Sequence, residues 1–440
     1  MKRYFYSLLS RYLSLFVLPQ NSVVEVDPVS PQGITPFANG SVTFRDLRNA
    51  SDTNRHARVI PFERLLVDKP DYILLNGLLH HERDIQALLA LIYTSSHPTT
   101  RLILTYYSNL WRPLMRLASV LGLRRKTPEI NWLAHQDIEN LLYLENFELI
   151  RREEKVIFPL WIPVISNFAN CYLAPLPFFR LFCLVNIVVA RPLCQLAEDE
   201  APSVSIVVPA RNESGNIEEI MRRIPAMGPR DEVIFIEGNS TDDTWSSIKR
   251  VYREHAETRG LQIAQQTGKG KGDAVRRGFE LARTEILMIL DADMTVPPED
   301  LVKFYRAIAA GRGEFINGTR LVYPMEKRAM RFFNLLGNKF FATAFSYVLG
   351  QRFKDTLCGT KVLSRENYLK LAANREFFGD FDPFGDFDLI FGASRMCLKT
   401  VEVPVRYAER KYGETNISRW RHGSILLVML LFAAKRIKFI

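Results

Sequence analysis

The stretch that most constrains the fold covers residues 285–298, EILMILDADMTVPP. Five consecutive apolar residues at 286–290 have the length of a strand that is buried on both faces of a sheet. Asp291 and Asp293 follow this strand directly, and a pair of prolines then breaks the chain. Open α/β sheets bind their ligands beyond the carboxyl ends of their strands. The stretch therefore predicts two carboxylates at the ligand-binding edge of an α/β sheet.

One small residue, Ala292, separates Asp291 from Asp293, so both carboxylates can share one hard divalent cation. Mg²⁺ and Mn²⁺ prefer such oxygen ligands and keep further positions for substrate phosphates. An acidic turn after an ordinary strand has the same pattern, and an Asp-x-Asp pair alone does not separate the two interpretations. The residues at the ends of the other strands are needed to choose between a metal site and an acidic turn.

The length of 440 residues exceeds the size of a single hydrophobic core, so two domains are expected. A net charge of +10 favours anionic partners such as nucleotide phosphates or anionic lipid. The five cysteines show no paired spacing, which predicts neither a disulfide framework nor a zinc site and fits a reducing cytosol. The pattern also predicts no signal peptide and no membrane span.

Residues 1–192 alternate predicted strands with predicted helices, which is typical of a mostly parallel, doubly wound sheet. The strands are expected at residues 21–27, 71–76 and 101–106, and the helices at residues 84–93 and 137–144. The apolar stretch 158–190 contains several prolines and an arginine, which favours packed loops and strands over a membrane segment.

This half resembles class I S-adenosylmethionine-dependent methyltransferases. The resemblance lies in the Val-Val-Glu-Val strand and in the segments 71–81 and 131–142, and it implies a Rossmann-like fold. The family carries a glycine-rich loop after the acidic strand, because glycine lets the backbone approach the cofactor closely. Here Asp27, Val29 and Pro31 occupy the glycine positions. We therefore expect a degenerate methyltransferase-like domain that binds no S-adenosylmethionine.

The polar segment 193–202 predicts a linker, and residues 203–422 predict a second α/β domain with a mostly parallel, doubly wound sheet. Three further strand ends in this domain carry polar turns, at residues 209–213, 238–244 and 265–272. Glycines and lysines in the last of these turns suit a phosphate. Each turn alone is also typical of helix caps in any α/β domain. Together with the aspartate pair, the turns suit base, ribose, phosphate and metal.

The order and spacing of these turns resemble the inverting family 2 glycosyltransferases with the GT-A fold, which include dolichol-phosphate mannose synthase. The resemblance implies a nucleotide-sugar donor linked to UDP or GDP, a Mg²⁺ or Mn²⁺ ion, and a polyprenyl phosphate acceptor. A hydroxyl of a cell-surface polysaccharide or glycolipid is the alternative acceptor. A methyltransferase and a non-catalytic binding protein are the rival classes. Nucleic acid is not expected as a partner, because acids rather than basic and aromatic residues mark the strand ends.

Carried over residue by residue, the resemblance assigns a set of nucleotide-sugar-binding residues. They are Pro209, Ala210, Arg211, Glu213, Glu237, Lys269, Asp291, Ala292, Asp293 and Arg320. Asp291 and Asp293 are also the expected metal ligands. Gly238 stands where the family has a second aspartate beside the nucleoside, which leaves the base open.

Three residues are the expected catalytic groups: Arg410, Asp388 and Asp386. Arg410 opens a tail motif, Arg-Lys-Tyr-Gly-Glu, whose arginine binds phosphate in the family. Asp388 matches a family carboxylate that faces the sugar, and Asp386 is the second choice. Either one can act as general base toward a hydroxyl. If the acceptor is a lipid phosphate, it is already ionised, and the carboxylate would instead hold the metal or orient the acceptor. An acidic surface loop has the same composition.

The carboxyl-terminal segment 423–440 predicts an amphipathic basic helix that lies on a membrane surface. Its apolar block is flanked by cations, namely Arg419, Arg421, Lys435, Arg436 and Lys438. Trp420 would lie at headgroup depth. These features predict a cytoplasmic protein that is peripheral at the inner membrane face. A core helix packed under the sheet is the alternative interpretation.

Overall fold

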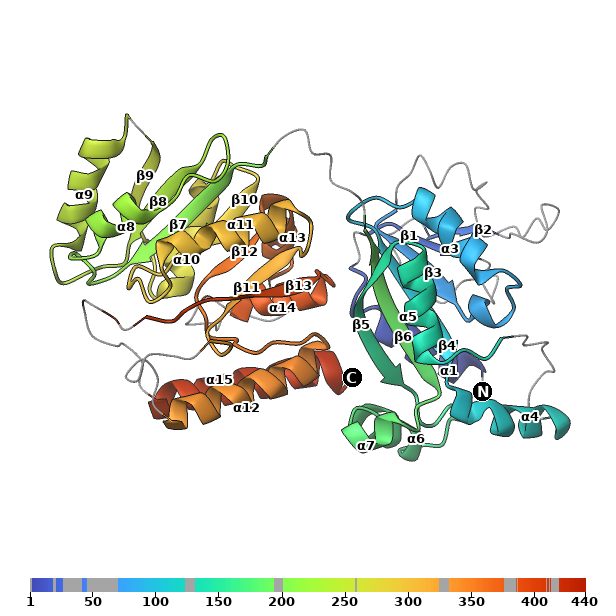
Figure 1. The fold of residues 1–440 in the computed structure, drawn as a ribbon. Helices are drawn as coiled ribbons and strands as arrows, with labels where there is room; N and C mark the ends of the chain where they lie inside the picture. Colours follow the sequence, from blue (N-terminus) through green and yellow to red (C-terminus); the bar gives the residue numbers. More distant parts are fainter. Residues whose placement is uncertain are drawn as a thin grey trace. The chain divides into compact units, whose positions relative to one another are not determined.

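The computed structural model describes residues 2–18, 21–26, 42–45, 70–122, 131–193, 201–257, 259–323, 332–375, 385, 387–408, 410, 412 and 419–440. The chain divides into two compact units (Figure 1). Unit 1 comprises Met1–Cys194 together with Ala434–Ile440, and unit 2 comprises Gln195–Ala433. The chain therefore passes from one unit to the other twice, because its last residues return to unit 1. Each unit is built on its own sheet.

The sheet of unit 1 has six strands in the order β2-β1-β3-β4-β6-β5. The strands, in that order, are Val42–Arg45, Val23–Val26, Tyr72–Asn76, Arg101–Tyr107, Val185–Pro192 and Phe147–Lys155. The first four run parallel, whereas β6 is antiparallel to both of its neighbours. The predicted strands at 71–76 and 101–106 are confirmed as β3 and β4, and both are almost entirely buried.

Helices α3 (Ile85–Thr94) and α5 (His135–Leu144) confirm the two predicted helices of this unit. Both place apolar residues in one core cluster with the strands, such as Leu89 of α3 and Leu142 of α5. Asp84 caps α3 by accepting a hydrogen bond from the Ala87 amide at 2.9 Å. The remaining helices of the unit are α1 (Lys2–Leu13), α4 (Arg112–Val120), α6 (Ile165–Phe168) and α7 (Pro177–Arg180).

The carboxyl-terminal residues differ from the prediction. Helix α15 (Arg419–Ala433) ends earlier than expected, and a π-helical turn, Ala434–Lys438, packs with unit 1. There the Lys438 ammonium lies 2.7 Å from the Glu153 carboxylate, and both side chains are only 2% exposed. The prediction that Lys438 is a surface cation for a membrane is therefore wrong, because burial with a carboxylate partner holds it inside the protein.

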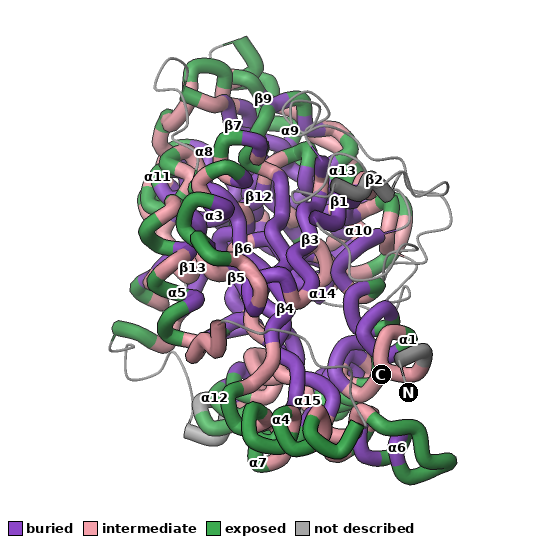
Figure 2. Tube along the Cα trace, turned by 90° about the vertical axis from the view of Figure 1, so that its right-hand side faces the viewer, coloured by how far each residue is buried: buried purple, intermediate pink, exposed green. Residues whose placement is uncertain are grey.

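The sheet of unit 2 has seven strands in the order β13-β11-β12-β10-β7-β8-β9. In that order they are Thr400–Pro404, Phe315–Thr319, Lys361–Ser364, Ile286–Ile289, Val204–Ala210, Glu232–Glu237 and Gly260–Gln265. The last four strands run parallel, and β12 is antiparallel to both neighbours, so the sheet is mixed. The strand predicted at 286–290 is confirmed as β10, which is buried along its whole length between two layers of helices. Figure 2 draws β7 and β12, the strands on either side of β10, largely in purple, the colour of buried residues.

The helices of unit 2 connect the strands and cover the sheet (Figure 1). They are α8 (Ile217–Arg223), α9 (Thr244–His255), α10 (Lys271–Leu281), α11 (Leu301–Ala309), α12 (Phe332–Leu349), α13 (Arg365–Ala373), α14 (Phe387–Arg395) and α15. Helices α12 and α15 pack against each other. Within the described part of the chain, no helix combines the length and the apolar content needed to cross a membrane.

Candidate active site

The turns after β7 and β8 are joined by hydrogen bonds at the carboxyl edge of the sheet in unit 2. Asn212, in the first turn, accepts a hydrogen bond from the Thr241 amide at 2.8 Å. The Glu213 amide donates to the Thr244 hydroxyl at 2.9 Å. Asn212 and Asn239 both have a φ of 56°, a left-handed conformation that asparagine tolerates better than most residues. The predicted turns at 209–213 and 238–244 therefore form one connected edge.

Glu237 closes β8 and remains a carboxylate. Its side chain accepts hydrogen bonds from the Ser240 amide at 2.5 Å and from the Gln265 amide group at 2.8 Å. Burial raises the pKa of Glu237, but these hydrogen bonds outweigh burial and hold its pKa below the usual value. At Gly238, a Cβ would lie 3.0 Å from Arg211 Cβ. The departure from the family aspartate at this position thus accompanies a close approach between the two turns.

Asp291 is paired with Lys271, the first residue of α10. The Lys271 ammonium lies 2.7 Å from Asp291 Oδ1. Burial raises the pKa of Asp291, but Lys271, followed by Lys361 and Arg320, lowers it more, so its pKa stays below the usual range. A Cβ on Gly359 would overlap Asp291 Oδ2, so only glycine fits in this part of the turn before β12.

Asp293 is paired with Arg410, which comes from the tail motif. Arg410 Nη2 donates to Asp293 Oδ2 at 2.7 Å, and Arg410 Nη1 donates to Glu213 Oε1 at 3.3 Å. Asp293 also accepts from the Thr295 amide and hydroxyl at 3.1 and 2.8 Å. Met294, between them, has a φ of 52°, which strains a residue with a Cβ. The structure therefore brings three predicted residues together: Glu213, Asp293 and Arg410.

Glu213 lies in a partly desolvated position beside this arginine. Burial raises the pKa of Glu213 to about 7, while Arg410 lowers it and Asp293 raises it further. Its second oxygen accepts a hydrogen bond from Asn216 Nδ2 at 2.7 Å. The same amide donates to the Ala292 carbonyl at 3.1 Å. Asn216 thereby ties the first turn to the aspartate pair.

These residues fit a divalent cation that takes few protein ligands. Among the described residues, no group of three or more His, Cys, Asp or Glu side chains has a metal-binding arrangement. Asp291 and Asp293 remain as two carboxylates on one turn, with side chains 29% and 15% exposed and each neutralised by a cation. Mg²⁺ and similar ions often bind through one or two carboxylates plus substrate phosphates. The donor set therefore suits an ion that arrives with a phosphate-bearing substrate.

The remaining predicted residues make other contacts. Lys269 is exposed, and Lys271 instead reaches Asp291. Arg320 makes two hydrogen bonds with the buried Asp355 carboxylate, at 2.6 and 2.8 Å. Asp388 accepts from Arg375 Nε at 2.7 Å. Asp386 lies outside the described residues.

Residues of the first turn differ in their exposure. Ala210 and Ala292 are buried, Pro209 is half-buried, and Arg211 is exposed at the edge. The aliphatic part of Arg211 packs beside Gly238, as described above.

Sequence reasoning missed the contacts of Lys271, Asn216 and Gly359 at this centre. Lys271 and Lys269 both lie in the Gly-Lys-Gly-Lys-Gly run, and the start of α10 at Lys271 decides which of them points at Asp291. Asn216 precedes α8, and its side chain makes no cap hydrogen bond but contacts Glu213 and the Ala292 carbonyl instead. Gly359 lies in the turn before β12, and its closeness to Asp291 depends on the antiparallel pairing of β12 with β10.

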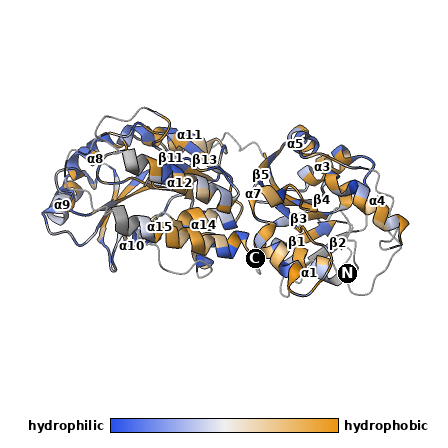
Figure 3. Cartoon of the chain, turned by 90° about the horizontal axis from the view of Figure 1, so that it is seen from below, coloured by the Kyte–Doolittle hydropathy of each residue, from blue (hydrophilic) through white to orange (hydrophobic). Residues whose placement is uncertain are grey.

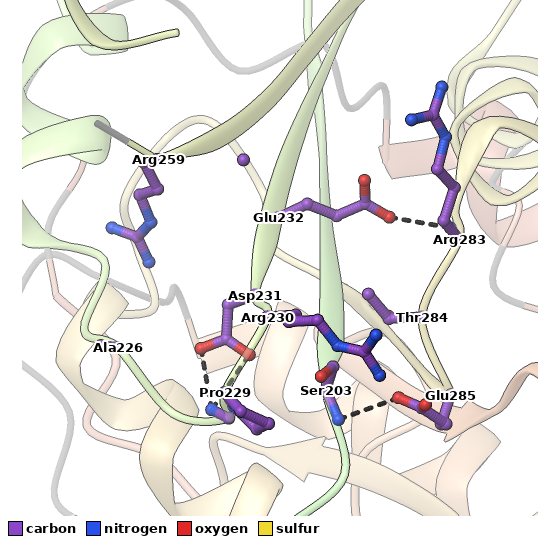
Figure 4. A pocket seen from close by; sticks show the side chains of 12 residues that line it. Ser203, Ala226, Pro229, Arg230, Asp231, Glu232, Arg259, Arg283, Thr284 and Glu285 are labelled. Carbon is purple, nitrogen blue, oxygen red and sulfur yellow. Dashed lines mark hydrogen bonds between the residues drawn. The ribbon is translucent and has the colours of Figure 1, made fainter. Parts of the chain in front are cut away.

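The described residues also form a hollow of about 690 Å³ at the opposite end of the same sheet (Figure 4). Its lining comes from the amino ends of the strands and includes Arg230, Arg259 and Glu285. Arg259 donates to the carbonyl oxygens of Ile224 and Pro225 at 2.8 and 3.0 Å. This hollow is separate from the aspartate pair, which lies beyond the carboxyl ends of the strands.

The sequence of unit 2 matches known proteins. The profile of Glycosyl transferase family 2 matches residues 205–370. Glycosyltransferase AglJ of Haloferax volcanii is 31% identical over 239 residues, which cover 53% of this chain and 72% of that protein. Undecaprenyl-phosphate 4-deoxy-4-formamido-L-arabinose transferase of Edwardsiella ictaluri is 25% identical, with 52% and 66% covered. The chain thus spans about two thirds of the length of the second relative.

Among solved structures, mannosyltransferase PcManGT of Pyrobaculum calidifontis, in complex with GDP-Man and Mn²⁺, is similar at 23% identity and a TM-score of 0.38. That similarity covers 54% of this chain and 65% of the other. Unit 2 is an α/β domain with a mixed sheet, and its sequence is that of a glycosyltransferase. The chain belongs to Glycosyl transferase family 2.

Proposed function

We propose that this glycosyltransferase moves a sugar from a UDP- or GDP-linked donor to a polyprenyl phosphate, with inversion at the anomeric carbon. The observation that carries the proposal is the convergence of Arg410 with Glu213 and Asp293, since it joins a distant tail motif to the aspartate pair. The name of the Edwardsiella relative, an undecaprenyl-phosphate transferase, supports the acceptor class. So does the name of a dolichol-phosphate mannosyltransferase of Pyrococcus furiosus, 31% identical over 122 residues.

The site suits departure of a nucleoside diphosphate. Negative charge develops on the diphosphate as the bond to the sugar breaks, and groups that neutralise this charge lower the barrier. Lys271 and Arg410 are two cations at the edge, each now paired with a carboxylate. Asp291 and Asp293 would hold Mg²⁺ or Mn²⁺, which supplies Lewis-acid stabilisation of phosphate oxygens when bound. The two carboxylates would then hold the metal, and Lys271 and Arg410 would turn toward the diphosphate.

The acceptor side leaves two roles open for Asp388. If the acceptor is a lipid phosphate, its oxygen is ionised at neutral pH and needs no base. Asp388 would then orient the acceptor, together with Arg375 and Arg276, which lie 2.7 and 3.9 Å away. If the acceptor is a glycan hydroxyl, Asp388 or Asp386 would act as general base. The remaining edge residues, including Glu237 and Arg211, would contact the nucleoside.

Transfer of labelled sugar from a panel of UDP and GDP sugars tests this proposal. The panel is run with Mn²⁺ or Mg²⁺ and with a short-chain polyprenyl phosphate or a glycolipid as acceptor. We expect label in the polyprenyl product, released by mild acid as an anomeric phosphate. If label appears only in the glycolipid, the acceptor is a glycolipid and not a polyprenyl phosphate. If no donor releases UDP or GDP, the proposed sugar transfer is contradicted.

We also propose that unit 2 is peripheral at the cytoplasmic face of a membrane, and the exposed apolar residues of α12 and α15 support the membrane contact. Leu426 and Met429 of α15 are buried, whereas Val428 and Leu431 on its other side are 59% and 61% exposed. The neighbouring α12 exposes Phe340 to 56%. One face of α15 therefore packs, as the core-helix interpretation predicts, and the other remains available for lipid, as the membrane interpretation predicts.

Unit 1 is proposed to be a degenerate methyltransferase-like domain without S-adenosylmethionine. The parallel order β2-β1-β3-β4 supports this assignment, because the chain reverses direction across the sheet beside β1, as in Rossmann-like sheets. The altered positions Asp27, Val29 and Pro31 lie outside the described residues. Titration calorimetry of the full chain with S-adenosylmethionine should give no binding heat, and micromolar affinity would refute the proposal.

A further inference from the structure

Helix α4 of unit 1 exposes an apolar stripe. Leu110, Leu114, Leu117 and Leu121 follow the spacing of one helix face and are 61%, 54%, 55% and 62% exposed. No residue of α4 (Arg112–Val120) is buried. Figure 2 accordingly draws the helix in green and pink, and Figure 3 shows its hydrophobic positions in orange. An amphipathic helix normally turns its apolar face to the core, so this one has the opposite orientation.

A second exposed apolar segment of unit 1 adjoins this helix. Trp111 Nε1, at the start of α4, donates to the Phe182 carbonyl at 2.9 Å. The segment 160–182 exposes large apolar side chains, among them Trp161, Val164, Ile165, Phe168, Phe178 and Leu181 at 54% to 80%. We call residues 110–121 and 160–182 together the α4/α7 surface. Monomeric proteins rarely expose this many large apolar side chains in two adjoining segments without a binding partner.

The charges around the α4/α7 surface identify its partner. Within residues 109–122, Arg112 and Arg116 are exposed basic residues, and this stretch contains no acidic residue. The sequence 157–182 also contains no acidic residue. A symmetric contact between two copies would place these cations against each other. An anionic lipid surface, in contrast, attracts each cation and accepts Trp, Phe and Leu at headgroup depth.

We propose that the α4/α7 surface docks unit 1 on an anionic lipid bilayer. Leu114, Leu117 and Leu121 enter the acyl boundary, and Arg116 contacts the headgroups. The docking is a property of unit 1, so it does not require sugar transfer or a particular acceptor. It also differs from the α15 face of unit 2, which uses other residues.

Flotation of the full chain with vesicles tests the proposal. The vesicles contain phosphatidylcholine alone or phosphatidylcholine mixed with phosphatidylglycerol. The stripe variant is Leu117→Gln with Leu121→Gln, and the charge variant is Arg116→Gln. The matched control is Leu369→Gln, which alters a leucine of α13 that is 52% exposed in unit 2. All of these positions are already exposed, so the variants should keep their fold.

We expect the stripe variant to lower the partition onto anionic vesicles by about tenfold or more, because two leucines no longer enter the lipid. The charge variant should lower it several-fold, and only on vesicles with phosphatidylglycerol. The control should match the wild type. Val428→Gln with Leu431→Gln measures the α15 face separately. Equal flotation of the stripe variant and the wild type would overturn the proposal.

Light scattering of the same proteins without lipid tests the alternative partner, a second copy of this chain. If the wild type is a dimer that the stripe variant dissociates, and neither protein floats, the surface binds a second copy and the lipid assignment is wrong. If both remain in the same oligomeric state, the loss of flotation belongs to lipid contact.

Discussion

Arg410 is the residue on which the arrangement of the site depends. Its guanidinium contacts both Glu213 and Asp293, so it holds the first turn and the aspartate turn together. The Asn216 side-chain amide donates hydrogen bonds both to the Glu213 carboxylate and to the Ala292 carbonyl. Charges that are partly removed from water interact more strongly than surface pairs, so a change in protonation at one of them is felt at the others. Two predictions belong to this scale.

The first prediction concerns the pH dependence of Glu213→Gln. Burial raises the pKa of Glu213 to about 7 in the folded protein, above the value of an exposed glutamate. Between the two pKa values the folded state binds more protons than the unfolded state, so stability falls as pH rises through this window. The glutamine does not titrate. The melting temperature of the variant should therefore rise relative to that of the wild type between about pH 5 and pH 8.

Differential scanning calorimetry without nucleotide or metal measures this difference. Glu254→Gln, on the exposed side of α9, supplies the control, since its curve should run parallel to that of the wild type. If the curve of melting temperature against pH for Glu213→Gln also runs parallel to that of the wild type, the pKa of Glu213 is not raised in the folded protein.

The second prediction compares two lysines of one glycine-rich run. Lys271 contacts Asp291 at 2.7 Å, whereas Lys269 is exposed. If Lys271 stabilises the departing diphosphate, Lys271→Met should lower kcat by about a hundredfold. Lys269→Met should retain activity within about twofold, as expected for an exposed cation. Steady-state release of nucleoside diphosphate measures both variants. A larger loss of kcat in Lys269→Met than in Lys271→Met would show that Lys269 contacts the diphosphate, as the sequence resemblance implies.

At the scale of elements, the packing of α10 on β7 places Lys271. Gly278 of α10 lies against Val207, and a Cβ at position 278 would overlap Val207 Cγ1. The helix thus approaches the sheet closely, and its first residue comes to lie beside Asp291. The close approach is one reason why a glycine stands in the middle of this helix despite its low helix propensity.

The third prediction follows from this contact. Gly278→Ala should lower the free energy of unfolding by about 1–3 kcal/mol, because the added methyl group overpacks the interface. Gly337→Ala in α12 is the matched control, since no atom lies within 4 Å of its Cβ. The control should raise stability by up to about 1 kcal/mol through helix propensity. Urea unfolding measures both, and equal effects would contradict the close packing.

The same elements show how far sequence reasoning reaches. An unbroken apolar run predicted β10, because a strand buried on both faces is apolar throughout. Shorter apolar runs, 72–75 and 102–104, lie within the predicted strands β3 and β4. The polar turns predicted the carboxyl edge and the pair Asp291 and Asp293. The partner of each carboxylate was not predictable in this way, because it depends on helix start, on positive φ at Met294 and on strand pairing with β12. Tertiary contacts of this kind leave no periodic signal in the chain.

At the scale of the whole molecule, the last residues of the chain belong to unit 1 although α15 belongs to unit 2. The Glu153 carboxylate accepts from Lys438 at 2.7 and 2.9 Å and from Arg151 at 2.8 and 3.0 Å. Burial lowers the pKa of Lys155, beside them, to about 8, and Glu153 opposes that shift. The tail is thus held through a buried charge cluster.

The fourth prediction removes the shared carboxylate. Glu153→Gln leaves buried cations facing one another, which should cost about 3–5 kcal/mol of unfolding free energy at neutral pH. Glu139→Gln, at a side chain that is 58% exposed, should change stability by less than about 0.5 kcal/mol. Denaturant unfolding followed by circular dichroism gives both values. A loss no larger than that of the control would mean that the tail does not depend on this cluster.

The central claim is that Asp291 and Asp293 form the metal and diphosphate site of a glycosyltransferase. The most direct test is release of nucleoside diphosphate from the preferred sugar donor by wild type, Asp293→Asn and the exposed control Glu254→Gln, each with Mn²⁺ and with excess chelator. We predict full activity for wild type and the control with Mn²⁺, and none for Asp293→Asn or in chelator, because an amide is a weaker ligand that lacks the charge. Wild-type turnover by a folded Asp293→Asn variant would contradict the account.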